Sequence, residues 1–146
     1  FNCRYFVAAH YIKCIPNAFY YYNMTESNST AKGRIDYLPQ GKKFSQAMID
    51  ATQSKGLYNC AAEAINDFYR HMLHIHLMFL LLPNEKISTQ QRIQAINQLY
   101  NTTDGTVLEM YLSSLSGVKN KLFYLLYKAR CSKLLILCVQ LVSGGK

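Results

Sequence analysis

The hydrophobic and polar positions of this chain follow a helical pattern along most of its length. The clearest segment covers about residues 57–82 and contains no proline and no glycine before Pro83. Its apolar residues recur at intervals of three and four, as they do on one face of an α-helix. This stripe consists of Ala61, Ala64, Ile65, Phe68, Met72, Ile75 and Phe79. The spacing predicts one long central helix over about residues 57–82.

Shorter stretches with the same period predict further helices. They cover residues 2–13, 43–54, 88–100, 106–116 and 118–142. Ser88 followed three residues later by Gln91 is typical of a capping box at a helix start. A length of 146 residues suits one domain. We therefore expect an all-α, single-domain bundle of five or six helices over residues 1–146.

Positive charge is concentrated in the last third of the chain. The whole sequence has 16 Lys and Arg against 8 Asp and Glu, a net charge of +8. Residues 110–146 contain six of these cations and no acid. This concentration of positive charge predicts an anionic partner. Lys outnumbers Arg, and apolar runs such as residues 122–127 lie between the cations, so we expect a lipid or protein partner and no nucleic acid.

Two apolar runs, residues 75–82 and 134–142, are apolar on nearly all sides. A domain of five or six helices can surround only one such helix, so the surplus predicts exposed hydrophobic patches, which mark interaction sites. Residues 119–142 carry five cations and no anion, and such a helix can lie in a membrane interface. A buried terminal helix is the alternative. Self-association through the patches also stays open.

These patterns select the residues expected to contact a membrane or partner. The basic set, predicted to provide attraction, is Lys119, Lys121, Lys128, Arg130 and Lys133. The apolar set, predicted to insert, is Leu80, Leu81, Leu82, Leu134, Leu135, Ile136 and Leu137.

Signals for catalysis are weak, and we expect a protein that is not an enzyme and uses no cofactor or metal. The chain has no G-x-S-x-G motif and no glycine-rich phosphate loop. Glu63, Asp67, His71 and His74 follow spacings of four, four and three, so a metal-dependent enzyme built on them is a further hypothesis. The simpler interpretation is the polar face of an amphipathic helix, in which Asp67 and His71 pair.

Several features indicate a secretory history. The chain opens at Phe1 without a leader, as expected of a mature chain whose targeting segment has been removed. Sequons at Asn23, Asn28 and Asn101 exceed the number expected by chance. Five cysteines allow at most two internal bridges, and buried free thiols are the alternative. They are Cys3, Cys14, Cys60, Cys131 and Cys138. No apolar run is long enough to span a bilayer.

The long predicted helix carries a motif of Ala61, Ile65, Asn66 and Tyr69, followed by an aliphatic stretch and residues 84–87 (NEKI). This resembles the long central helix of abalone sperm lysin, which has the same Ala-x-x-x-Val-Asn-x-x-Tyr spacing. Residues 17–19 (NAF) are similar to a short element near that family's N-terminus, with one residue missing. The absence of Trp and the five cysteines are departures from lysin itself. They place the resemblance closest to the fusagenic acrosomal sperm protein branch.

The resemblance implies a function in fertilization without bond chemistry. Lysin opens the egg's vitelline envelope by stoichiometric binding, and the fusagenic branch acts at the sperm–egg plasma membrane. We therefore expect a secreted gamete-recognition protein of the sperm acrosomal vesicle that perturbs membranes and promotes their fusion. Its expected partners are an anionic membrane surface, an egg-surface protein, or both. A lysin-like binder of an egg-coat glycoprotein and a helical cytokine-like ligand are the alternatives. The matched positions pack helices, so they transfer no functional residue.

Overall fold

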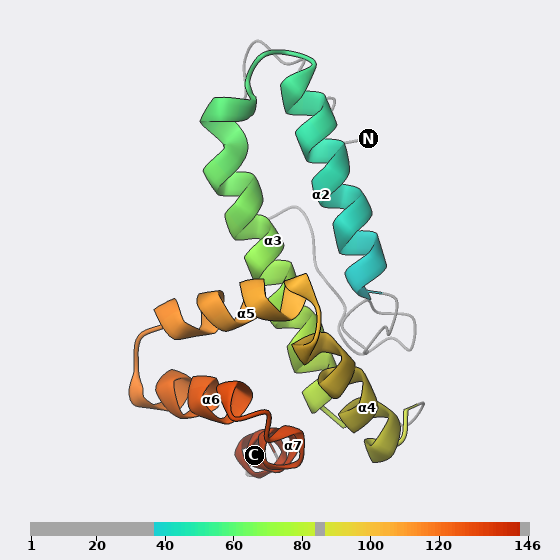
Figure 1. Ribbon diagram of the computed structural model, residues 1–146, viewed down its shortest axis with the longest axis vertical. Helices are drawn as coiled ribbons and strands as arrows, with labels where there is room; N and C mark the ends of the chain where they lie inside the picture. The colour runs from blue at the N-terminus through green and yellow to red at the C-terminus, as the bar shows by residue number, and fades with distance from the viewer. Residues whose placement is uncertain (1–36, 84–86, 144–146) are drawn as a thin grey trace, which may run out of the picture.

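The computed structural model describes residues 37–83 and 87–143, and all regular structure within these ranges is helical (Figure 1). The helices are α2 (Tyr37–Gln53), α3 (Tyr58–Leu81), α4 (Thr89–Tyr100), α5 (Thr103–Ser114), α6 (Val118–Lys128) and α7 (Ser132–Ser143). The all-α prediction is therefore confirmed. Several predictions concern residues that lie outside these ranges. They are the helix over residues 2–13, the 17–19 element, the motif residues 84–86, Cys3, Cys14 and the sequons at Asn23 and Asn28.

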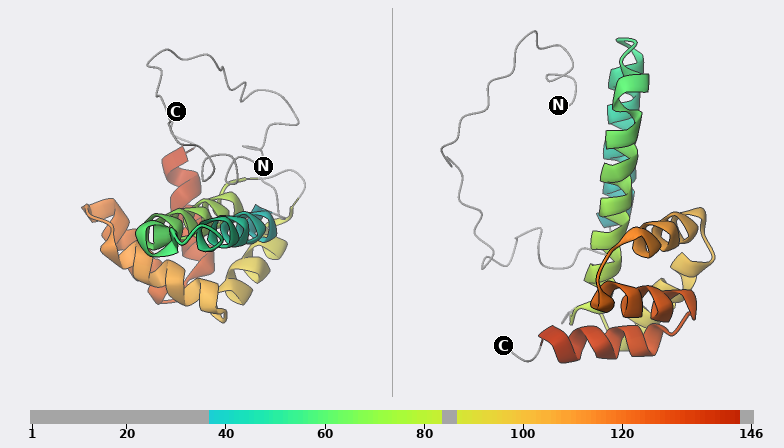
Figure 2. Two further views of the ribbon diagram at one scale, coloured as in Figure 1. Left: turned by 90° about the horizontal axis from the view of Figure 1, so that it is seen from above. Right: turned by 90° about the vertical axis from the view of Figure 1, so that its left-hand side faces the viewer.

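Two groups of helices build the molecule. α2 and α3 run antiparallel and form a hairpin whose turn projects away from the other helices (Figure 1). The C-terminal half of α3 enters the second group, because α3 also packs against α4, α5 and α7. α6 packs against α5 and α7. α7 crosses the end of the molecule farthest from the hairpin turn (Figure 2).

Helix ends follow local chemistry that the sequence partly predicts. The capping box at α4 is confirmed: the Gln91 N–H donates to Ser88 Oγ at 3.2 Å, and the Ser88 N–H donates to Gln91 Oε1 at 2.9 Å. α2 begins at Tyr37, six residues before the predicted start at residue 43. Pro39 does not interrupt the helix, because it lies in the first turn, where no backbone N–H is needed for an intrahelical hydrogen bond. α5 begins at Thr103 rather than at residue 106, because the Thr102 hydroxyl accepts the Gly105 N–H and caps the helix.

The prediction of a single helix over residues 118–142 is wrong, because a tight turn divides this range into α6 and α7. Arg130 takes a left-handed backbone conformation with φ +54°. The Arg130 N–H donates to Tyr127 O at 2.9 Å, and the Cys131 N–H donates to Leu126 O at 3.0 Å. This pair of bonds is the Schellman motif that ends many helices. Glycine usually occupies the left-handed position, and its absence here hides the break in the sequence pattern.

The hydrophobic core forms where the C-terminal half of α3 meets the second group of helices. Its buried members are Leu73, Leu77, Leu80, Leu81, Ile96, Leu99, Leu108, Leu112, Tyr127, Leu135 and Ile136. The stripe predicted for α3 is only partly correct, because Ile65 is its one buried member and Phe68, Met72, Ile75 and Phe79 are half-buried. The buried face of α3 instead follows Leu73, His76, Leu77 and Leu80.

Core formation removes two predicted insertion residues from the surface. Leu80 is 3% exposed and Leu81 is fully buried, while Leu82 is half-buried at the end of α3. α4, α5 and α7 all pack against α3, so its aliphatic end is covered on several sides. The expectation that Leu80 and Leu81 reach a membrane is therefore corrected.

A buried arginine closes the end of α3. Arg92 of α4 is 3% exposed, and its Nη1 donates to the carbonyl oxygens of Leu81 at 3.1 Å and Leu82 at 2.9 Å. Carbonyls at a helix C-terminus lack internal donors and carry partial negative charge, so a guanidinium stabilises them. Arg92 thereby ties the start of α4 to the end of α3.

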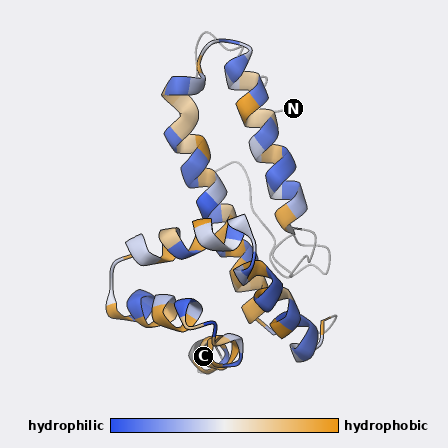
Figure 3. Ribbon diagram, in the orientation of Figure 1, coloured by the Kyte–Doolittle hydropathy of each residue, from blue (hydrophilic) through white to orange (hydrophobic). Residues whose placement is uncertain are grey.

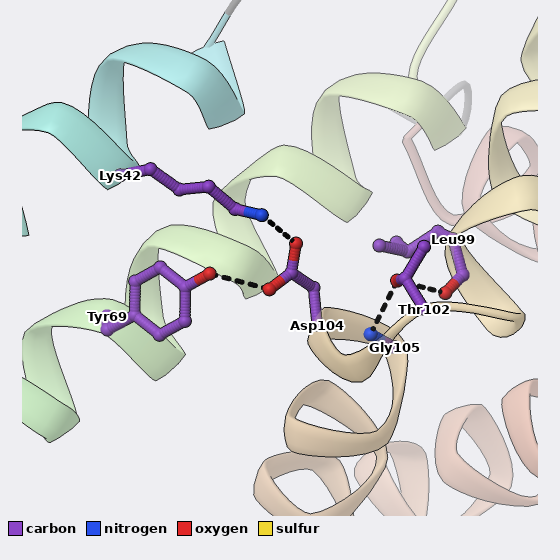
Figure 4. A network of polar contacts seen from close by, with 6 residues as sticks. All are labelled: Lys42, Tyr69, Leu99, Thr102, Asp104 and Gly105. Carbon is purple, nitrogen blue, oxygen red and sulfur yellow. Dashed lines mark hydrogen bonds and ion pairs between the residues drawn. The ribbon is translucent and has the colours of Figure 1, made fainter.

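Asp104 joins three helices through its two carboxylate oxygens (Figure 4). The Tyr69 hydroxyl donates to Oδ1 at 2.6 Å, and the Lys42 ammonium pairs with Oδ2 at 2.5 Å. Burial, followed by the hydrogen bond and the negative charge of Asp104, raises the pKa of Tyr69 well above its usual range. Tyr69 therefore remains a hydrogen-bond donor, and the network ties α2, α3 and α5 together.

Gly105 lets α5 approach the end of α4 closely. A Cβ at this position would overlap the carbonyl oxygen of Leu99 and lie 2.9 Å from its carbonyl carbon. The Gly105 carbonyl also accepts a 3.3 Å hydrogen bond from the Tyr127 hydroxyl of α6. Three helices thus depend on the absence of a side chain here.

We predict that Gly105→Ala lowers the free energy of unfolding by about 1–3 kcal/mol, because the added carbon meets rigid backbone. Urea unfolding followed by circular dichroism measures this change. Thr106→Ala alters the neighbouring exposed residue and is the control, with little expected effect. Equal stability of Gly105→Ala and the unaltered protein would contradict the packing described.

The two histidines that pack inward make stability depend on pH. His76 is 9% exposed, and burial lowers its pKa, with a partial opposing effect from Asp104. The His74 ring lies 5.7 Å from the Tyr111 ring. Burial and the nearby His71 lower the pKa of His74. The folded protein therefore binds protons less readily than the unfolded chain, whose histidines titrate near 6.5.

The free energy of unfolding is expected to fall as the pH drops below about 6.5. The reason is that His74 and His76 then bind protons more readily in the unfolded chain than in the folded chain. Urea unfolding between about pH 7.5 and 5.5 tests this. The double variant His74→Gln and His76→Gln should show a flatter dependence. An unchanged pH slope in that variant would assign the effect to other groups.

Candidate functional site

The five predicted basic residues all lie on the surface of α6, α7 and the turn between them. The Lys128 ammonium lies 5.7 Å from the centre of the Tyr124 ring, and Arg130 Nη1 donates to Asn101 Oδ1 at 3.1 Å. Within the described residues, none of the five forms an ion pair with an acid. Their positive charge is therefore not neutralised by the described part of the chain.

Large exposed hydrophobic residues gather on the same two helices. Of the nine in the described residues, six belong to α6 or α7: Val118, Leu122, Leu125, Leu134, Leu137 and Leu141. Figure 3 shows hydrophobic positions along both helices. We call these six residues and the five cations the α6–α7 surface.

The exposed stripe of α6 faces away from the core. Val118, Leu122 and Leu125 are 85%, 55% and 58% exposed and are separated by four and three residues, so they share one face. Consecutive helical residues are turned by about 100°, which puts Tyr127 about 180° from Val118. Tyr127 is 2% exposed and forms the buried side of α6. The hydrophobic stripe therefore points outward.

Lysines border this stripe on both sides. By the same helical geometry, Lys121 and Lys128 lie about 70–90° to one side of the stripe and Lys119 lies about 90° to the other. All three are exposed. The outer face of α6 thus has an apolar centre with a cationic edge on each side.

α7 divides the predicted insertion run between two faces. Leu134 and Leu137 are 48% and 49% exposed, whereas Leu135 is fully buried and Ile136 is 3% exposed. A helix cannot present four consecutive side chains on one side, since each is turned by about 100° from the last. The expectation that Leu135 and Ile136 insert is therefore corrected. Leu141, 70% exposed, completes the outer stripe, and Lys133 borders it.

The prediction missed four exposed residues of the α6–α7 surface: Val118, Leu122, Leu125 and Leu141. The spacing of four and three between Val118, Leu122 and Leu125 was visible in the sequence. A prediction of one helix over residues 118–142 joined them to the residues of α7. The turn at Arg130 separates the two stripes.

The residues of the metal hypothesis do not form a ligand set. In residues 37–83 and 87–143, no three His, Cys, Asp or Glu side chains are grouped so that they could hold a metal ion. Asp67 Oδ1 instead accepts a 2.7 Å hydrogen bond from Arg70 Nη1. His74 packs on Tyr111. Glu63, Asp67 and His71 are exposed and form the polar side of α3, whereas His74 is half-buried.

The three described cysteines are free thiols: Cys60 is exposed, and Cys131 and Cys138 are half-buried. The expectation of buried thiols is therefore not met at Cys60. None of the described helices has both the length and the hydropathy needed to cross a bilayer.

No family model matches this chain, and no curated protein and no solved structure matches it either.

Proposed function

We propose that this protein is a secreted gamete protein that binds an anionic membrane through the α6–α7 surface and perturbs it, promoting sperm–egg membrane fusion without bond chemistry. The observation that carries the proposal is the pair of outward apolar stripes bordered by cations that pair with no described acid. The gamete setting comes from the sequence resemblance to the sperm lysin family. α3 as the central helix of a lysin-type bundle belongs to the same proposal, supported by its packing against α2, α4, α5 and α7.

Attraction is the first step. Each exposed Lys or Arg near an anionic surface contributes up to about 1 kcal/mol, and this contribution falls off within a Debye length. The α6–α7 surface brings five such cations together, and no Asp or Glu follows Glu109 in the chain. Charge complementarity therefore favours an anionic lipid surface.

Shallow insertion is the second step. α6 and α7 have 11 and 12 residues, which makes each about 17 Å long, much shorter than the roughly 30 Å hydrocarbon core of a bilayer. A helix with an exposed apolar face bordered by Lys and Arg is suited to lie in the interface plane, with that face buried among the upper acyl chains. Displaced lipids disturb local packing, which is the perturbation that the proposed fusion step uses.

The charge of the α6–α7 surface also favours membrane binding over self-association. A two-fold dimer formed through the α6–α7 surface would bring ten cations together, because each copy contributes five. Such repulsion disfavours the dimer, whereas lipid phosphates would relieve it. A lysin-like binder of an egg-coat glycoprotein and a helical cytokine-like ligand remain the alternatives, and a saturable complex with a protein receptor that is indifferent to lipid would replace the membrane proposal.

We predict flotation with vesicles of phosphatidylserine and phosphatidylcholine at low salt, together with dye leakage and lipid mixing. Replacing two cations, Lys121→Gln and Lys133→Gln, should weaken binding by about 30-fold at about 1 kcal/mol each. Lys43→Gln with Lys55→Gln removes the same charge from exposed positions of the hairpin and is the matched control. The absence of leakage and lipid mixing on these vesicles would reject the proposal.

The apolar stripes are tested separately by leakage. Leu125→Ser and Leu137→Ser should each remove about 1 kcal/mol or more of insertion energy, so the double variant should bind vesicles but release little dye. Met110→Ser, at a 68% exposed position of α5, is the control and should leak like the unaltered protein. Full leakage by the double variant would show that the stripes do not insert.

A further inference from the structure

The position of α7 gives its exposed stripe a direction. α7 lies across the end of the molecule opposite the α2–α3 turn (Figure 2). Its buried residues Leu135 and Ile136 belong to the core, and the helix packs against α3, α4 and α6. Leu134, Leu137 and Leu141 occupy the other side of the helix. They therefore face away from the hairpin.

α6 is turned in a compatible way. Its buried residue Tyr127 donates to the Gly105 carbonyl of α5, and its ring lies 4.9 Å from the Tyr100 ring of α4, edge to face. The stripe of α6 lies on the opposite side of the helix, away from both of these contacts. Both stripes are thus directed out of the end of the molecule that α6 and α7 form.

The end of the molecule formed by α6 and α7 also differs in charge from the end formed by the hairpin turn. Residues 118–141 contain five cations and no acid. The outer part of the hairpin, residues 43–70, contains Lys43, Lys55 and Arg70 against Asp50, Glu63 and Asp67, a net charge of 3 − 3 = 0. An anionic surface attracts the first end and does not attract the second, so the field of the protein itself orients its approach.

We infer that the bound protein stands on α6 and α7, with these helices in the membrane plane and the α2–α3 hairpin directed away from the lipid. This inference rests on the proposed function and adds the orientation in which it is carried out. α3 has 24 residues and is about 36 Å long, several times the Debye length of about 8 Å. The hairpin turn at residues 54–57 therefore lies in water, beyond the electrostatic reach of the headgroups, where its exposed Leu57 touches no lipid.

The chain contains no Trp, so a single introduced Trp reports on one position. Leu125→Trp, Leu137→Trp and Leu57→Trp each replace an exposed leucine, on α6, on α7 and at the hairpin turn. Each variant is mixed with phosphatidylserine and phosphatidylcholine vesicles whose acyl chains carry bromine, which quenches nearby Trp. Circular dichroism checks the fold of each variant, and flotation measures binding independently.

The expected result is a blue shift and loss of most of the fluorescence for Leu125→Trp and Leu137→Trp, with neither change for Leu57→Trp. Bound protein that is quenched at position 57 overturns the orientation, as does bound protein that is quenched at neither 125 nor 137. In both of these cases flotation still shows membrane binding, but quenching at neither 125 nor 137 also removes the α6–α7 surface as the site of insertion. No flotation of the unaltered protein rejects the proposed function, and the orientation falls with it.

Discussion

Burial of the leucine-rich end of α3 is the constraint on which the remaining architecture depends. Leu73, Leu77 and Leu81 are fully buried, and α4, α5 and α7 are held in place by covering them. Burying a leucine side chain contributes about 1.5–3 kcal/mol, so these contacts outweigh any local preference of the surrounding helices. Once this interior is occupied, α7 has a covered side and an uncovered side, although its sequence is apolar on both.

The α6–α7 surface exists because the core covers only some of the hydrophobic residues of these two helices. α6 and α7 each contribute residues to the core, Tyr127 from one and Leu135 and Ile136 from the other. The leucines on their outer sides have no helix left to cover them among the described residues. Exposed cations border these stripes, so positive charge and exposed hydrophobic side chains occur together on the same two helices.

Polar contacts define geometry where hydrophobic contacts do not. Leucines can pack at many angles, whereas the Asp104 carboxylate can accept from Tyr69 and pair with Lys42 in few arrangements of α2, α3 and α5. Arg92 acts similarly at the end of α3, and Gly105 acts through the space that it leaves. These three residues are unremarkable in the sequence pattern, because their roles depend on partners at least ten residues away or on the close approach of two helices.

Amino-acid order alone determined the helical class, the capping box at Ser88, the extent of α3 to within one residue at each end, and the concentration of cations after residue 110. These features depend on neighbours within one or two turns, which periodicity records. Tertiary structure alone decided which side of each apolar helix is buried. A helix that is apolar all round has no preferred inner face until others pack on it. Leu80 and Leu135 therefore lie inside, Leu125 and Leu141 lie outside, and Arg130 takes the left-handed turn that separates the two stripes.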